Sequence, residues 1–169
     1  MTHGGAILRT WSDRTPFPRW LVRKACCGHD EGMTSPTRPD DLWLGEFLTA
    51  HGGVAGTVHR RAGEVLTLTS SVRIPPPVVE MVRSVPMGRG MAGQAAESKR
   101  PFQTCNLKSD PSADVRPGAR LVAAQAAVAL PVLDAKGEVR AVVGIAFARE
   151  GEIAADEVAR LTAAASRLG

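Results

Sequence analysis

The pattern of hydrophobic and polar positions predicts alternating helices and strands over residues 40–169. Apolar residues spaced three and four apart indicate helices, alternation or short apolar runs indicate strands, and glycines and prolines fall between the segments. The expected elements are a helix over 40–51, strands over 54–61 and 64–72, a helix over 78–84, a helix opening at Gly90, strands over 102–106, 126–133 and 138–148, and a helix over 154–168. This order predicts an α+β fold, a central antiparallel sheet with helices packed on it.

The two strands over 126–133 and 138–148 are expected to lie inside the sheet. Both are nearly continuous runs of apolar residues, which is typical of strands that are covered on both faces. The tetrapeptide Asp-Ala-Lys-Gly at 134–137 joins them as a hairpin turn. The sequence therefore places this hairpin in the core.

The last helix carries apolar residues at a 4-3-4-3 spacing, which is typical of a helix that packs on another helix. We expect this seam to support a homodimer through the terminal helices. Its members are Ala154, Val158, Leu161, Ala165 and Leu168.

Residues 1–39 differ from the rest of the chain. Prolines interrupt them and their large apolar residues show no regular period, so we expect a flexible N-terminal extension to a domain over 40–169. The cluster Cys26-Cys27-Gly28-His29 lies in this extension. It lacks the paired spacing of zinc ligands, and no metal site is predicted there.

The net charge of +4 does not indicate a nucleic-acid partner, because it is spread along the chain. Residues 1–32 and 33–169 each carry a net charge of +2, and neither contains a basic run with interleaved aromatics. We expect no membrane association either. The longest mostly apolar run, 121–133, is too short to span a bilayer and contains Gln125 and Pro131.

Cysteine usage indicates the cytoplasm. The chain has three cysteines, an odd number that does not suit a disulfide framework. Its first residues are broken by polar side chains and prolines, unlike a secretion signal. We therefore expect a cytoplasmic protein.

Three segments read MGRGMAGQAAESKRPFQTCNL at 87–107, AAVALPVLDAKGEVRAVVGIAFA at 126–148 and IAADEVARLTAAAS at 153–166. Together they resemble the GAF domain, the small-molecule sensor fold of bacterial signalling proteins. The positions that match the family pattern are Gly90, Gly93, Pro101, Pro131, Gly137 and Gly144. The resemblance covers about residues 40–169 and implies a pocket formed by the sheet, the turn and helix over 88–98, and the loop over 107–123.

The glycine turn has two interpretations that the sequence leaves open. Gly90 and Gly93 permit an anionic or carbonyl group to approach a helix N-terminus, or they simply let the helix lie against the sheet. In the pocket, Gln94 and Asn106 would supply the few polar contacts that an apolar site needs. The residues expected to bind the ligand are Met91, Gln94, Phe102, Cys105, Asn106 and Gln125. His51 and His59 have no further ligands at metal spacing, so no metal site or catalytic residue is assigned.

These observations predict a non-enzymatic sensor. A small ligand would change the packing of the first and last helices, which would signal through a helical dimer to a partner protein. The sequence identifies neither the ligand nor a cofactor. The alternative is a thiol-based redox sensor or a methionine-sulfoxide-reductase-like enzyme that uses Cys105. The free methionine-(R)-sulfoxide reductases, which share the GAF-like fold, rely on several cysteines, whereas the predicted domain contains only Cys105.

Overall fold

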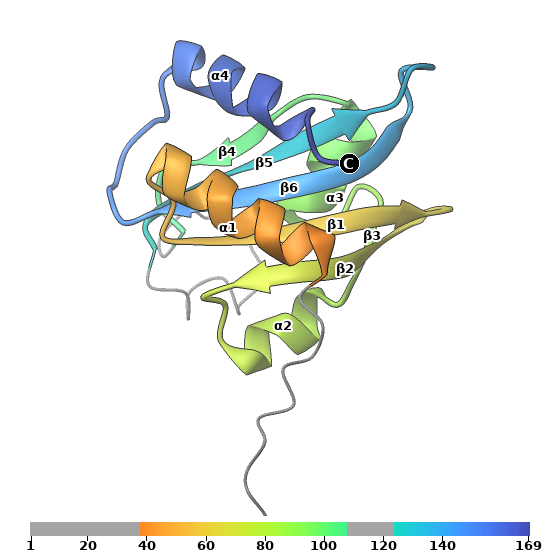
Figure 1. Cartoon of the computed structure of the whole chain (residues 1–169), viewed down its shortest axis with the longest axis horizontal. Coiled ribbons are helices and arrows are strands. Elements are labelled where there is room, and N and C mark those ends of the chain that lie inside the picture. The colour runs from red at the N-terminus through yellow and green to blue at the C-terminus, as the bar shows by residue number, and fades with distance from the viewer. Residues whose placement is uncertain (1–37, 108–123) are drawn as a thin grey trace, which may run out of the picture. The chain divides into compact units, whose positions relative to one another are not determined.

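The computed structural model describes residues 38–107 and 124–169, all within one compact unit that begins at Pro36. Most of the expected extension, with Cys26 and Cys27, lies outside the described residues, as does the expected loop beyond Leu107. None of the described helices is long and apolar enough to cross a membrane. The elements are α1 (Pro39–His51), β1 (Ala55–Ala62), β2 (Val65–Val72), α2 (Pro76–Val82), β3 (Ser84–Pro86), α3 (Gly90–Ser98), β4 (Phe102–Thr104), β5 (Ala126–Leu133), β6 (Val139–Phe147) and α4 (Ala155–Ala165) (Figure 1).

The six strands form one antiparallel sheet in the order β3-β2-β1-β6-β5-β4. β1 and β6 pair at its centre, so the hairpins β1–β2 and β5–β6 meet although they lie far apart in the sequence. Glycines at φ +65° and +77°, Gly63 and Gly137, lie in the two hairpin turns. Helices pack on this sheet, which confirms the predicted α+β fold.

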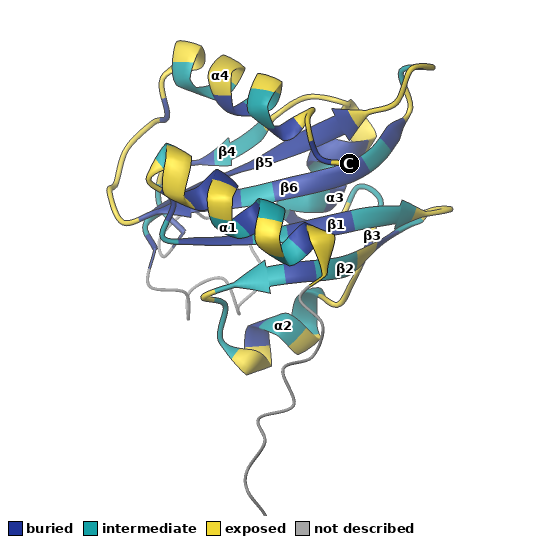
Figure 2. Ribbon diagram, viewed as in Figure 1, coloured by how far each residue is buried: buried dark blue, intermediate teal, exposed yellow. Residues whose placement is uncertain are grey.

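The strands β5 and β6 divide their side chains between the two faces of the sheet. Val128 and Leu130 on β5, with Val143 and Ile145 on β6, join the apolar cluster that contains α1 and α4. The residues between them join the clusters that contain α2 and α3. Every residue of β5 except Leu133 is buried, which confirms that this hairpin lies in the core (Figure 2).

Helix α1 packs on the sheet through Leu44, Phe47 and Leu48, which are all buried. Two acidic residues in its first turn suit the positive end of the helix dipole. Gly52, at φ +68°, ends the helix where the Gly52-Gly53 pair predicts.

Helix α2 and strand β4 differ in extent from the prediction. Helix α2 starts at Pro76 rather than Val78, because the fixed φ of proline fits the first turn of a helix. Strand β4 ends at Thr104. The next carbonyl, that of Cys105, accepts a hydrogen bond from the main-chain N–H of Gly151 at 3.1 Å instead of continuing the ladder.

The apolar seam of the last helix packs inside its own chain. Leu161, Ala165 and Leu168 are buried in the cluster that α4 shares with α1 and the sheet, whereas Ala154 is exposed. A helical apolar stripe packs equally well on a sheet of its own domain and on a second subunit. These three side chains are therefore not available to a partner, and a dimer needs a different surface.

Candidate ligand-binding site

A cavity of about 160 Å³ lies between the sheet and the helices α2 and α3. Its lining residues on the strands face away from the cluster that contains α1 and α4, so the cavity is on the opposite face of the sheet. Figure 1 shows α1 and α4 together on the near side of the sheet. Protein interiors are normally packed with few voids larger than a water molecule. A cavity of this size is therefore the first candidate for a binding site.

Small residues on three neighbouring strands form the floor of the cavity. Ala127 and Ala129 on β5 lie opposite Ala146 and Gly144 on β6, and Ala55 on β1 is paired with Ala146. Because successive strand residues alternate between faces, these small residues all face α2 and α3. The space exists because side chains of ordinary core size are missing from this row.

Longer apolar side chains form the roof. Val78, Met81 and Val82 come from α2, Ile74 precedes that helix, and Met91 comes from the first turn of α3. Methionine side chains are flexible and adapt to irregular spaces. The roof can therefore adjust to an occupant more easily than the floor can.

The glycine turn before α3 allows close packing of the backbone. A Cβ at Gly93 would lie 2.4 Å from the main-chain oxygen of Pro86. Gly88 and Gly90 have φ of +75° and +61°, which favours glycine. The geometry at Gly93 therefore supports the interpretation in which the glycines serve close packing. Gly90 in addition lines the cavity.

His59 ties the floor of the cavity to its roof. It lies on β1, is 3% exposed, and its Nε2 is 2.9 Å from the main-chain oxygen of Val82 on α2. Since a carbonyl oxygen only accepts, Nε2 carries the hydrogen of this bond. A β-bulge shifts the register between β1 and β2 at this point. In residues 38–107 and 124–169 no group of three or more side chains is placed to hold a metal ion.

Thr57 supplies a hydroxyl to the same lining. It lies on β1 two residues before His59, on the same face of the sheet, and is paired with Gly144 on β6. A hydroxyl both donates and accepts hydrogen bonds. Within the described lining, Thr57 and His59 are the residues with polar side chains.

Arg60 lies next to His59 in sequence and on the other face of the sheet. Its Nη2 and Nε donate to Asp40 Oδ1 and Oδ2 of α1 at 2.6 and 3.0 Å. Nη2 also donates to the main-chain oxygen of Gly169 at 2.6 Å. The hydrogen bond from Arg60, assisted by one from the Thr69 hydroxyl, holds the pKa of the Asp40 carboxyl below its ordinary value of 3.8. This cluster fastens the start of α1 and Gly169, four residues beyond the end of α4, to one strand.

Of the six residues expected to bind a ligand, Met91 lines the cavity. Gln94 lies on the next turn of α3, half-buried and outside the described lining. Phe102, on β4, packs in the apolar cluster around Leu66 and Ala96. α3 therefore contributes its first turn to the cavity.

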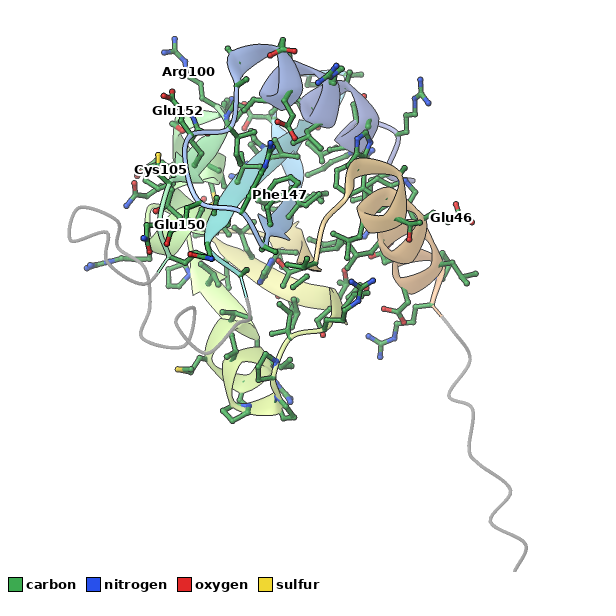
Figure 3. All side chains as sticks on the ribbon, turned by 90° about the vertical axis from the view of Figure 1, so that its left-hand side faces the viewer. Glu46, Arg100, Cys105, Phe147, Glu150 and Glu152 are labelled. Carbon is green, nitrogen blue, oxygen red and sulfur yellow. The ribbon has the colours of Figure 1, made fainter. Side chains whose placement is uncertain are left out.

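The other three expected residues lie at the ends of β4 and β5. Cys105 is exposed and lies on the outside of the domain (Figure 3). Asn106 Nδ2 donates to Glu150 Oε1 at 3.3 Å. Gln125 joins two segments through its main chain, accepting from Leu107 at 2.6 Å and donating to Phe147 at 2.8 Å. None of the three belongs to the described lining of the cavity.

Sequence reasoning missed the floor residues, although the sequence contains a signal for them. On the face toward α2 and α3, β5 and β6 carry the small residues Ala127, Ala129, Gly144 and Ala146 next to one another, while the neighbouring positions on the other face carry valine, leucine, isoleucine and phenylalanine. An asymmetry of this kind between two buried faces indicates a space on the side with small residues.

Comparison with known proteins gives one consistent result. The sequence profile described as GAF domain matches residues 43–169. No curated protein matches the chain in sequence. The GAF domain of an Acinetobacter phosphoenolpyruvate-protein phosphotransferase is similar in structure, with a TM-score of 0.62 and 15% identity over 80% of this chain and 81% of that one.

Two further solved structures share the fold. One is the A. Aeolicus nlh2 GAF domain in an inactive state, with a TM-score of 0.53 and 20% identity over 73% of each chain. The other is a Staphylococcus aureus NreA protein mutated in its nitrate binding site, with a TM-score of 0.59 and 14% identity over 75% of this chain and 95% of that one. Together with the profile match over most of the described residues, these structures confirm the resemblance seen in the sequence. The chain belongs to the GAF domain family.

Proposed function

We propose that this GAF domain is a non-enzymatic sensor whose small-molecule ligand occupies the cavity between the sheet and the helices α2 and α3. The observation that carries the proposal is the cavity itself, about 160 Å³ on one face of the sheet, whereas the described residues of the other face form an apolar cluster with α1 and α4. Its row of small floor residues leaves this space on one face of the sheet alone. GAF domains are generally regulatory domains that bind small molecules, and we place this one in the cytoplasm.

Strand β1 provides a route from the cavity to the opposite face. His59 connects it to α2 in the roof, and the following residue, Arg60, connects it to Asp40 at the start of α1. Neighbouring strand residues point to opposite faces, so a small movement of β1 reaches both. A ligand that binds more tightly to one position of the roof would then favour one arrangement of α1.

An anion such as nitrate is not the ligand that we propose. The NreA protein with a related fold has a nitrate binding site. In the described lining of this cavity, by contrast, no lysine or arginine is present. An anion that is buried without a cation or several donors loses more hydration energy than it regains.

For output we propose a homodimer, or contact with a partner protein, through the outer face of α1. Leu42 on that face is 60% exposed and is an uncommonly exposed large apolar side chain for this domain. Gly45 and Thr49 follow it along the helix, and these small residues leave a shallow depression beside Leu42. The exposed positions of α4 carry only alanine and charged residues, so α1 is the helix on this face that exposes a large apolar side chain.

The thiol alternative has no support from the geometry. Cys105 is the one cysteine among the described residues, and it is exposed at the end of β4, away from the cavity lining. A thiol enzyme of this fold would need its reactive sulfur at the ligand. We therefore do not assign a catalytic role to Cys105.

Native mass spectrometry of the chain purified from its own host tests the sensor function. Wild-type protein is compared with Ala127→Leu, which fills the floor, and with Ala159→Leu, which adds the same side chain on the exposed side of α4. We expect a small molecule to accompany the wild type and Ala159→Leu and to be lost from Ala127→Leu. A molecule that Ala127→Leu retains in full would place the ligand elsewhere.

A further inference from the structure

We infer that the cavity takes a neutral, compact and mostly apolar molecule, about the size of one substituted benzene ring, whose single polar group hydrogen-bonds to the Thr57 hydroxyl. This inference rests on the proposed sensor function and adds the chemical class of the ligand. Size, charge and the position of one hydroxyl each support it.

The size of the cavity sets the first limit. Its volume of about 160 Å³ is close to that of an engineered apolar cavity of about 150 Å³ that binds benzene. Clefts that hold drug-sized ligands measure about 300–1,000 Å³. The described space therefore suits a compact ligand better than a nucleotide or a tetrapyrrole.

The lining sets the second limit, because none of the described residues that face the space carries a charged side chain. Among the described residues that line it, alanine, glycine, valine, isoleucine, leucine and methionine account for all but Thr57 and His59. His59 is already committed through Nε2 to the main-chain oxygen of Val82. A charged ligand would be buried here without an opposite charge, at a large cost in desolvation. The occupant is therefore uncharged.

The Thr57 hydroxyl sets the orientation of the ligand in the cavity. No hydrogen bond to another described residue involves its hydroxyl. The hydroxyl group lies against Gly144, since a Cβ at that residue would be 2.7 Å from Thr57 Oγ1. One hydroxyl in an apolar lining is the usual device that fixes the orientation of a small ligand. It accepts from an alcohol or phenol and donates to a carbonyl, so both groups suit the site.

The test uses three probes of nearly equal shape. Benzene is apolar, phenol adds a hydroxyl, and benzoate adds a negative charge. Binding to the whole chain is measured by calorimetry and by the NMR shifts of the alanine methyl groups of the floor. We expect phenol to bind in the millimolar range or tighter, benzene to bind more weakly, and benzoate to bind at least about tenfold more weakly than phenol.

Thr57→Val removes the hydroxyl and keeps the shape of the side chain. We expect it to weaken phenol binding about two- to tenfold, the usual range for one net hydrogen bond, and to leave benzene binding unchanged. Ala127→Leu and, independently, Ala146→Leu should abolish binding of both probes, whereas Ala159→Leu should retain it. Two filling variants are used so that misfolding of one does not decide the result.

The outcomes separate the ligand class from the sensor function. If benzoate binds as tightly as phenol and is lost in both filling variants, the ligand class is wrong while the cavity remains the binding site. Failure of benzene and phenol to bind at millimolar concentrations also overturns the ligand class. An effect of Thr57→Val that is equal for benzene and phenol overturns the role of the hydroxyl. If phenol binds equally well to both filling variants, it binds outside the cavity, and the cavity as the site of this ligand is overturned.

Discussion

Gly144 on β6 lies so close to Thr57 on β1 that a Cβ at residue 144 would be 2.7 Å from Thr57 Oγ1. No real Cβ contact is this short, so the absence of a side chain at Gly144 determines where the Thr57 hydroxyl lies. Both residues line the cavity. Their contact therefore couples the shape of the floor to its hydroxyl group.

Gly144→Ala tests this contact. The added methyl group must displace the Thr57 side chain, and such overpacking of a core costs about 1–3 kcal/mol. We expect a loss of that size in the free energy of urea unfolding, together with weaker phenol binding. The matched control is Gly45→Ala on α1, where a Cβ meets nothing within 4 Å. Since alanine is the better helix former, the control should gain about 0.5–1 kcal/mol. Equal effects of the two variants would contradict the contact.

Gly93→Ala should damage the turn that carries Met91 into the roof. The new Cβ would lie 2.4 Å from the main-chain oxygen of Pro86, and a backbone atom cannot rotate away as a side chain can. We expect destabilisation of more than about 2 kcal/mol, measured by urea unfolding. Hydrogen exchange should show the loss of protection concentrated in β3 and the first turn of α3. A variant as stable as the wild type would show that Gly93 is not required by packing.

The pair of Asp40 and Arg60 predicts a dependence of stability on pH. The pKa of Asp40 is lowered in the folded state, mainly by the hydrogen bond from Arg60, so the pair contributes stability above the ordinary value of 3.8. That contribution is lost as the pH falls below 3.8 and through the lowered pKa. We expect Asp40→Asn to cost about 1–2 kcal/mol near pH 7, a moderate amount because the Arg60 side chain is 37% exposed.

The difference between wild type and Asp40→Asn should then shrink as the pH is lowered from 4 toward 2, which urea titrations at several pH values would measure. Asp156→Asn is the control, since Asp156 pairs with Arg160 at 3.5 Å on the surface and both side chains are at least 70% exposed. Its effect should stay within about 0.5 kcal/mol. A cost at Asp40 that does not change with pH would rule out the charged pair.

Cys105→Ser should leave both stability and probe binding unchanged. The side chain is exposed and does not line the cavity. The measurement is phenol affinity, with methionine-sulfoxide turnover as a second readout. Turnover in the wild type that disappears in Cys105→Ser would revive the thiol alternative and contradict a sensor without enzymatic activity.

Leu42→Glu should weaken self-association if the outer face of α1 forms the dimer. Sedimentation at tens of micromolar, a range typical of weak dimers, would show a wild-type dimer and a variant monomer. Asp41→Asn on the same helix is a mild control. A wild-type monomer under these conditions would contradict the homodimer and leave contact with a different partner protein.

The hydrophobic pattern predicted the fold well because each element carries its own local signal. The two apolar strands on either side of the turn at 134–137, the glycines after His51 and the 4-3-4-3 spacing of the last helix all correspond to observed elements. The pattern also identifies which side chains of a helix are buried, but it does not identify the surface against which they pack. For this reason the seam with Leu161 and Leu168 suggested a second subunit, whereas it packs on its own sheet.

The cavity was harder to predict, because its shape depends on side chains that are absent. Alanines such as Ala127 and Ala146 occur both in strands against which a helix packs closely and in strands that border a cavity. The difference depends on how closely α2 approaches, and that distance is set by contacts between residues far apart in the sequence, such as His59 with Val82. Residues were predicted to bind the ligand because they lie near the glycine turn in the sequence. This criterion selected Met91, which lines the cavity, but also Cys105, which is exposed.

The most direct test of the cavity as the ligand site is a thermal-shift screen of small metabolites against wild type, Ala127→Leu and Ala159→Leu. A ligand that binds only the folded state raises the melting temperature, and the stabilisation grows with the logarithm of its concentration above Kd. We predict that neutral, compact compounds raise the melting temperature of the wild type and of Ala159→Leu, and have no effect on Ala127→Leu. Compounds that stabilise all three proteins equally would contradict a ligand site in this cavity.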